Sequence, residues 1–113
     1  MARINGQLVG SVQVHLAAKA NAVHRAEVAK LMVHPDYRRR GIGERLMGAA
    51  EEACKNEGRS LIVLDTREGD PSNILYQKLG YIAAGRIPGY ALSSNGSLDG
   101  TVIYYKPLPD ASN

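Results

Sequence analysis

The stretch YRRRGIGERLM, residues 37–47, places three arginines and a Gly-x-Gly pair directly before a helical pattern. The first turn of a helix carries unpaired backbone N–H groups and a partial positive charge, and both attract phosphate groups. Glycines at positions 41 and 43 remove β-carbons that would keep a phosphate from the backbone, and arginines add bidentate contacts. The stretch therefore predicts a diphosphate site, and the plainer alternative is a solvated arginine run ahead of an ordinary helix.

Two common phosphate-binding loops do not fit this stretch. A Walker loop continues with Lys and Ser or Thr after its last glycine, whereas Glu44 follows Gly43 here. The dinucleotide fingerprint places its glycines immediately after a strand and adds a third glycine. Here residues 34–40 intervene, and Leu46 or Met47 stands where the third glycine is expected.

The patterns around the stretch predict an α/β fold. A strand over residues 26–34 precedes the arginines, a helix over about residues 42–57 follows them, and residues 60–66 form a buried strand. Strict alternation on the first of these strands places Glu27, Ala29, Leu31 and Val33 on one face.

A second helix is predicted after the buried strand. Asp70 is expected to cap it, and Pro71 suits its first turn. Leu75 and Leu79 are predicted to form its inward face, and Gly80 its end.

Strands are predicted at both ends of the chain. Asn5-Gly6 between two strand-like segments is a strong hairpin signal. Further strands are expected near residues 81–87 and 101–106, with a loop over residues 89–100 between them. We therefore predict an α/β fold with a mixed sheet, organised as one domain over residues 1–113.

The composition limits the classes of function. The net charge of +3 favours an anionic partner, but no aromatic residues interleave with the arginines as in nucleic-acid surfaces. The single cysteine, Cys54, rules out an internal disulfide, and the apolar run at residues 61–64 is far shorter than the roughly 20 residues that span a bilayer. His15, His24 and His34 share no metal-ligand spacing with Cys54. We expect a cytoplasmic protein that binds no metal, nucleic acid or membrane.

Two motifs resemble the signatures of the GNAT acetyltransferases. Residues 31–43, LMVHPDYRRRGIG, are similar to that family's acetyl-CoA motif, Arg/Gln-x-x-Gly-x-Gly/Ala after a strand ending in Val-x-Pro. Residues 73–81, NILYQKLGY, match its second signature, Asn-x-x-Tyr-x-Lys-x-Gly-Phe/Tyr. The resemblance covers nearly the whole chain. Four segments look like the tabtoxin-resistance acetyltransferases in particular: residues 25–47, 64–66, 88–90 and 103–106.

The resemblance implies a GNAT-like, mostly antiparallel mixed sheet with a central strand–helix–strand unit, and acetyl-CoA as the cosubstrate. The backbone of Leu31, Met32 and Val33 would pair with the pantetheine arm, and the amide near Val33 could polarise the thioester carbonyl. The remaining cofactor-binding residues implied by the resemblance are Arg38, Arg39, Arg40, Gly41, Ile42, Gly43 and Glu44 at the diphosphate, and Asn73 and Tyr76 nearer the thioester.

Three residues are candidates for proton transfer. An alkyl amine is almost fully protonated at neutral pH, so the attacking amine must lose a proton. Glu27 stands where several GNAT enzymes carry a general-base glutamate, and Asp65, after a buried strand, is the second candidate base or amine anchor. Tyr76 is the family's candidate general acid for the departing thiolate. The structural alternatives are a surface glutamate paired with Arg25 or Lys30, a turn aspartate and a packing tyrosine.

The resemblance implies transfer of acetyl from acetyl-CoA to a primary amine. The tabtoxin-like segments favour a small molecule such as a toxin or an antibiotic, and a protein N-terminus or a lysine is left open. The family normally begins with a strand and two helices that form one wall of the acceptor site, so we expect an N-terminally shortened member. A second subunit, as in a homodimer, could supply that wall. The alternatives are a CoA-binding module without turnover and, more remotely, a nucleotide or nucleic-acid binder.

Overall fold

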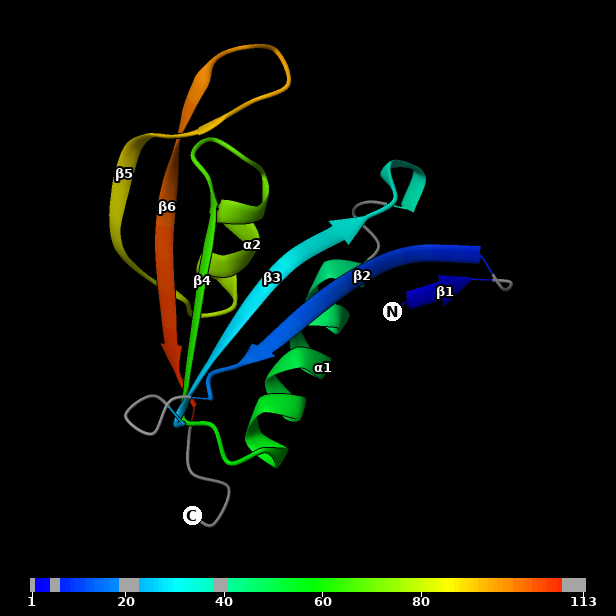
Figure 1. The fold of residues 1–113 in the computed structure, drawn as a ribbon. Helices are drawn as coiled ribbons and strands as arrows, with labels where there is room; N and C mark the ends of the chain where they lie inside the picture. The colour runs from blue at the N-terminus through cyan, green and yellow to red at the C-terminus, as the bar shows by residue number, and fades with distance from the viewer. Residues whose placement is uncertain (1, 5–6, 19–22, 38–40, 109–113) are drawn as a thin grey trace. The chain divides into compact units, whose positions relative to one another are not determined.

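The computed structural model describes residues 2–4, 7–18, 23–37 and 41–108 (Figure 1). The chain divides into two compact units, of which the first comprises Met1–Ile62 with Pro107–Asn113 and the second Val63–Lys106. Each unit contains strands and one α-helix. No helix within the described ranges is both long and apolar enough to cross a membrane.

The first unit begins with three antiparallel strands. Strand β1 (Ala2–Ile4) pairs with β2 (Gln7–Leu16), and β2 pairs with β3 (Arg25–Val33). Ile4 is the register partner of Gln7, so two residues connect β1 to β2. The predicted hairpin is confirmed, although its Asn5-Gly6 turn lies outside the described residues.

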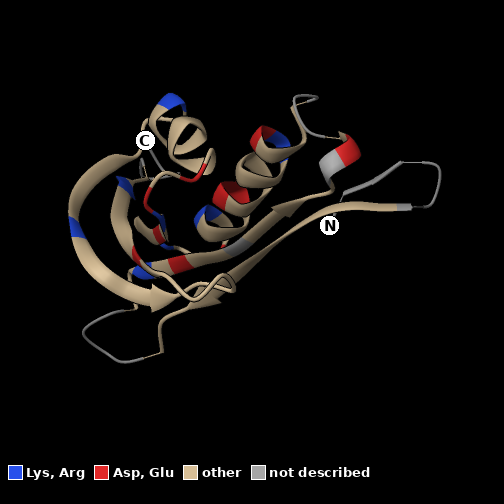
Figure 2. Cartoon of the chain, turned by 90° about the horizontal axis from the view of Figure 1, so that it is seen from above, with Lys and Arg blue, Asp and Glu red and all other residues tan. Residues whose placement is uncertain are grey.

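Helix α1 (Ile42–Asn56) packs against β2 and β3. Ile42 and Leu46 form a cluster with Val9. A β-carbon at Gly10 would lie 2.9 Å from Cδ1 of Leu46 and 3.1 Å from Cγ2 of Ile42, so a glycine is needed for β2 to approach the helix this closely. Figure 2 shows acidic and basic residues along α1, consistent with an amphipathic helix. The buried residues of α1 recur at helical spacing and are Ile42, Leu46, Met47, Ala50 and Cys54.

Strand β3 contains a β-bulge. Ser11 of β2 pairs with Met32, whereas Gln13 pairs with Ala29. Between these two pairs β3 therefore has one more residue than β2, which is the definition of a bulge. An extra residue reverses the in–out alternation of the side chains that follow it.

The bulge corrects the face assignment for β3. The β2 partners of Val28 and Val33 are four residues apart, so Val28 and Val33 lie on the same face of β3. Leu31 and Val33 pack against the cluster on α1. Glu27, exposed, and Ala29 therefore lie on the face away from α1, and the predicted grouping of Glu27 and Ala29 with Leu31 and Val33 is wrong.

The second unit contains most of β4 (Leu61–Arg67), α2 (Ser72–Lys78), β5 (Ile82–Leu92) and most of β6 (Leu98–Pro107). Strands β5 and β6 form an antiparallel hairpin. The chain order β3–α1–β4 matches the predicted strand–helix–strand succession. The predicted α/β class with mostly antiparallel strands is confirmed.

The β5–β6 hairpin is longer than predicted because β5 tolerates a bulge at Pro88 and Gly89. Three residues of β5, 88–90, stand opposite Gly100 of β6 at this point. Gly89 has a φ of 61°, in the left-handed region that glycine adopts without strain. Pro88 lacks a backbone donor, and a bulge is one of the few places where a strand accepts it.

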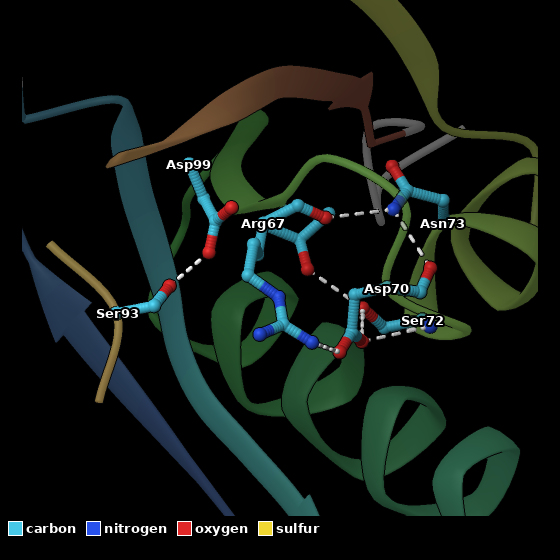
Figure 3. Close-up of polar contacts among 7 residues, drawn as sticks. Arg67, Asp70, Ser72, Asn73, Ser93 and Asp99 are labelled. Carbon is cyan, nitrogen blue, oxygen red and sulfur yellow. Dashed lines mark hydrogen bonds and ion pairs between the residues drawn. The ribbon is translucent and has the colours of Figure 1, made fainter. Parts of the chain in front are cut away.

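The predicted loop over residues 89–100 is therefore wrong. The strands continue to Leu92 and from Leu98, and residues 93–97 form the turn. The hydroxyl of Ser93 donates a hydrogen bond to the carboxylate of Asp99 beside this turn (Figure 3).

Candidate functional site

The turn before α1 is shaped by Gly41. This residue has a φ of 75°, which disfavours any residue with a β-carbon. It makes no side-chain capping bond, and the first helical bond runs from the N–H of Arg45 to the Gly41 carbonyl at 3.1 Å. The N–H groups of Ile42 and Gly43 precede that bond at the positive end of the helix dipole. This end of α1 fits an anionic group.

The segment between β3 and α1 is held by His34. The N–H of Asp36 donates to Nδ1 of His34 at 3.2 Å, and the N–H of Tyr37 donates to the His34 carbonyl at 2.9 Å. The rings of His34 and Tyr37 pack edge to face at 5.6 Å. These contacts accompany the short helix η2 (Pro35–Tyr37), which follows β3. Arg38, Arg39 and Arg40 themselves lie outside the described residues.

The end of β3 anchors two of the three residues predicted to bind pantetheine. Leu31 and Val33 pack against the cluster on α1, whereas the side chain of Met32 is 62% exposed. The bulge lies just before Met32 in the pairing with β2. Glu44, in the first turn of α1, is half-buried, and its charge has a favourable sign for the helix dipole.

Glu27 lies on the exposed face of β3. Its register partner is His15, whose Nε2 lies 3.2 Å from Oε1 of Gln13. Register partners on antiparallel strands share a face, so Glu27, His15 and Gln13 form a polar strip on the side away from α1. No ion pair joins Glu27 to Arg25 or any other described side chain. A carboxylate here is accessible to a cationic ligand.

Tyr76 is the buried residue of α2. It is 5% exposed, and its ring centroid lies 5.8 Å from those of both Tyr81 and Tyr104. Burial, and then the negative charges of Asp70 and Asp65, raise the pKa of Tyr76 to about 12. The hydroxyl is therefore a hydrogen-bond donor at neutral pH.

Tyr76 also changes the predicted orientation of α2. Leu75 and Leu79, predicted to form the inward face, are only half-buried. The inward side of the helix is centred on the ring of Tyr76, because it packs within a tyrosine cluster that the aliphatic pattern did not reveal.

The first turn of α2 is organised by Asp70 and Asn73. Oδ2 of Asp70 accepts two hydrogen bonds from Ser72, one from its N–H at 3.0 Å and one from its hydroxyl at 2.6 Å (Figure 3). Nη2 of Arg67 lies 3.6 Å from Oδ1 of Asp70. The N-cap position of α2 is Pro71, one residue later than predicted, but Asp70 makes the bond to a first-turn N–H that the prediction expected of it. Nδ2 of Asn73 donates to the carbonyls of Arg67 at 3.0 Å and Asp70 at 2.8 Å. Oδ1 of Asn73 accepts the hydroxyl of Tyr104 at 2.8 Å. Both Asn73 donors are thus used within the unit, and a predicted ligand contact would have to use the second lone pair of Oδ1.

Asp65 is exposed on β4 and is bonded to a buried side chain. Oγ1 of Thr101, a residue only 4% exposed, lies 3.2 Å from Oδ2 of Asp65 and 3.0 Å from the carbonyl of Thr66. The second unit thus brings Asp65 and Tyr76 into electrostatic reach of each other. The sequence did not indicate a role for Thr101, although a hydroxyl residue at the start of an apolar strand was a possible signal. Tyr104, which was expected to line the acceptor side, is only 1% exposed and bonds Asn73 instead.

Comparisons with known proteins converge on one family. Residues 1–81 match the family model described as acetyltransferase (GNAT) family. An acetyltransferase of Pectobacterium atrosepticum is 37% identical over 82 residues, which are 72% of this chain and 55% of that protein. The chain thus spans about half the length of the curated relatives it matches.

Solved structures share the fold. The ribosomal-protein-S18-alanine N-acetyltransferase of Escherichia coli superposes with a TM-score of 0.81 at 23% identity, covering 96% of this chain and 67% of that one. An acetyltransferase of Salmonella typhimurium, solved with its cofactor acetyl-CoA, gives a TM-score of 0.83 at 19% identity, covering 96% and 66%. The predicted GNAT-like fold is confirmed.

Proposed function

Because this chain belongs to the GNAT acetyltransferase family, we propose that it transfers the acetyl group of acetyl-CoA to a primary amine. The observation that carries the proposal lies in the second unit. There burial, and then the negative charges of Asp70 and Asp65, raise the pKa of the Tyr76 phenol, while Asp65 itself is an exposed carboxylate. A carboxylate can accept the proton that the amine must lose, and a protonated phenol can donate a hydrogen bond to the departing sulfur.

The first unit is proposed to hold the cofactor's diphosphate. The left-handed Gly41 and the amides of Ile42, Gly43 and Glu44 form the start of α1, where a negative charge is favoured. Arg38, Arg39 and Arg40 directly precede Gly41 in the sequence and would add charge-assisted bonds.

The pantetheine arm is proposed to follow the end of β3. The side chains of Leu31 and Val33 are fixed on the α1 side, so the backbone of Leu31, Met32 and Val33 is held in place for strand-like pairing. The remaining lone pair of Asn73 Oδ1 is a further candidate contact. When bound, acetyl-CoA supplies an acetyl group activated as a thioester.

The acceptor ammonium is proposed to give a proton to Asp65, directly or through water. The freed nitrogen lone pair forms the C–N bond to the acetyl carbon while the C–S bond breaks. The hydroxyl of Tyr76 donates a hydrogen bond to the departing sulfur, which leaves as a thiol after taking up one of the two amine protons. The reaction converts ammonium and thioester into amide, thiol and one released proton.

Asp65 is proposed as the base in preference to Glu27. Asp65 has a hydroxyl donor on one oxygen and lies within electrostatic reach of Tyr76. Glu27 lies on the open face of β3, on the side away from α1. We assign Glu27 the role of attracting the acceptor's positive charge.

The acceptor is proposed to be a small-molecule amine, as the tabtoxin-like segments suggest. One of these segments, residues 88–90, forms the bulge of β5 and leaves Tyr90 57% exposed. An exposed ring on a fixed bulge suits contact with a compact substrate.

A homodimer is proposed as the assembly, and light scattering of the full chain tests it.

The experiment is a thiol-release assay on the full chain, with mass spectrometry of the product. The acceptors are a panel of small primary amines, a peptide with a free N-terminus and a lysine peptide blocked at its N-terminus. We expect acetylation of a small amine and a fall of about 100-fold or more in kcat for Asp65→Asn. Glu27→Gln should raise KM more than it lowers kcat. Calorimetry that detects acetyl-CoA binding without any product from the panel would favour the CoA-binding module.

A further inference from the structure

Thr101 has a chemical environment that packing alone does not explain. Among the residues that the structure describes, it is the one non-aromatic polar side chain that is buried, at 4% exposed. Burying a hydroxyl costs free energy unless the hydroxyl is hydrogen-bonded, and an aliphatic residue such as valine has nearly the same shape. The contacts made by the hydroxyl are therefore the feature to explain.

The Thr101 hydroxyl has one proton and two acceptors within reach. Oδ2 of Asp65 lies 3.2 Å from Oγ1, and the carbonyl of Thr66 lies 3.0 Å from it. Asp65 and Thr66 are consecutive on β4, so one hydroxyl contacts both the backbone of that strand and the carboxylate that projects from it. None of the described residues donates a hydrogen bond to the other oxygen, Oδ1.

The β6 segment that carries Thr101 is itself fixed. The N–H of Glu68 donates to the carbonyl of Gly100 at 2.8 Å. A β-carbon at Gly100 would lie 3.1 Å from both Oε2 of Glu68 and the carbonyl of Ile87, so this position is closely packed on two sides. Thr101 is thus presented to β4 from a rigid element, which is what a positioning residue requires.

We propose that Thr101 is a positioning residue for Asp65: its hydroxyl holds Oδ2 and thereby directs Oδ1 toward the acceptor amine. This inference rests on the proposed function, in which Asp65 takes the amine proton. An exposed carboxylate without such a contact exchanges between rotamers, and only some of these place an oxygen for proton transfer. Thr101 does not touch the substrate, and it acts through Asp65.

Other charged side chains in the second unit make contacts of their own. These contacts join Arg67 to Asp70, Glu68 to Arg86, Asp99 to Ser93 and Ser97, and Lys106 to the carbonyl of Leu79. Among the described residues, Thr101 is the one that donates a side-chain hydrogen bond to Asp65.

The test compares Thr101→Val, which removes the hydroxyl and keeps the shape, with Thr101→Ser, which keeps the hydroxyl. We expect Thr101→Val to lower kcat about 10- to 100-fold with little change in the KM for acetyl-CoA, and Thr101→Ser to stay within about threefold of the unmodified chain. In an Asp65→Asn background, Thr101→Val should cause no further loss. An equal loss in both backgrounds would show that Thr101 has only a structural role and would overturn the inference.

A second measurement does not depend on turnover. The χ1 rotamer of Asp65 is followed by NMR, through three-bond couplings, in the full chain and in Thr101→Val, or in Thr101→Ala if the valine variant does not fold. Loss of the Thr101 hydroxyl should replace one preferred rotamer by an averaged mixture. The same rotamer distribution in the variant and the unmodified chain would overturn the inference. If the unmodified chain shows no turnover, the proposed function fails separately, and this measurement still decides whether Thr101 holds Asp65.

Discussion

The hydroxyl of Tyr104 donates a hydrogen bond to Oδ1 of Asn73 at 2.8 Å and so links β6 to the first turn of α2. The amide nitrogen of the same Asn73 holds the carbonyls of Arg67 and Asp70. One side chain therefore connects β6, the end of β4 and the start of the helix that carries Tyr76. The position of the proposed hydrogen-bond donor depends on this connection.

Replacing Tyr104 with phenylalanine should weaken that connection without leaving a cavity. We expect Tyr104→Phe to lower the free energy of unfolding by about 1 kcal/mol, the usual net contribution of one hydrogen bond, as measured by urea denaturation. Tyr105→Phe is the matched control, because Tyr105 is only half-buried and should change stability by less than about 0.5 kcal/mol. Equal effects of the two substitutions would contradict the role given to the Tyr104–Asn73 bond.

Tyr76 should make the protein sensitive to alkaline pH. A tyrosine titrates near pH 10 in the unfolded chain, whereas the folded pKa of Tyr76 is about 12. The unfolded state therefore loses this proton first, and the stabilising contribution is fully present below about pH 10 and is lost as the pH rises toward 12. The difference corresponds to roughly 2–3 kcal/mol.

The measurement is urea unfolding at several pH values from 8 to 12. Tyr76→Phe should show a smaller loss of stability than the unmodified chain across the alkaline range. Tyr90→Phe removes an exposed hydroxyl and serves as the control, with the same alkaline slope as the unmodified chain. If the free energy of unfolding falls equally with pH in Tyr76→Phe and in the unmodified chain, the result would contradict the burial of the Tyr76 hydroxyl.

Gly41, just before α1, and Gly48, within it, should respond in opposite directions to alanine. Gly41 has a φ of 75°, so Gly41→Ala should cost about 1–2 kcal/mol of stability. Gly48 lies inside the helix with nothing within 4 Å of its β-carbon position, so Gly48→Ala should stabilise by about 0.5–1 kcal/mol. Calorimetry should show weaker acetyl-CoA binding for Gly41→Ala alone. Equal acetyl-CoA affinity of the two variants would show that the turn at Gly41 does not contribute to cofactor binding.

Arg59 should contribute to stability through its bonds to Ala17, which follows β2, and Val23, which precedes β3. Its Nη1 donates to the carbonyl of Ala17 at 2.9 Å and also to the carbonyl of Val23. Arg59→Ala should therefore cost about 1.5–3 kcal/mol in thermal or urea unfolding, because bonds from a charged donor are lost. Arg25→Ala, at an exposed position of the same unit, should cost less than about 0.5 kcal/mol. A comparable loss in both variants would mean that the bonds of Arg59 to Ala17 and Val23 do not stabilise the fold.

The elements that depend on local sequence were predictable. The Asn5-Gly6 signal, the apolar spacing of α1 and the Asp70 cap each require only neighbouring residues, and each has the expected outcome. In these cases the physical cause lies within a few residues of its effect.

The features that depend on pairing between distant residues were not predictable. The β3 bulge is set by its register with β2, and it moved Glu27 off the face assigned by strict alternation. The sequence predicted a loop from Gly89 onward, whereas the structure has a bulge within β5, because pairing with β6 continues beyond Pro88 and Gly89. The contact of Thr101 with Asp65 joins residues 36 positions apart, and no local sequence pattern predicts a contact at that separation.

The most direct test of the account is the formation of an N-acetylated amine by the full chain. The chain is incubated with acetyl-CoA and the amine panel, and free thiol and acetylated product are quantified together. We predict equimolar thiol and acetylated amine, with both reduced about 100-fold or more in Asp65→Asn while acetyl-CoA still binds. Thiol release without acetylated amine, or equal product from Asp65→Asn, would contradict it.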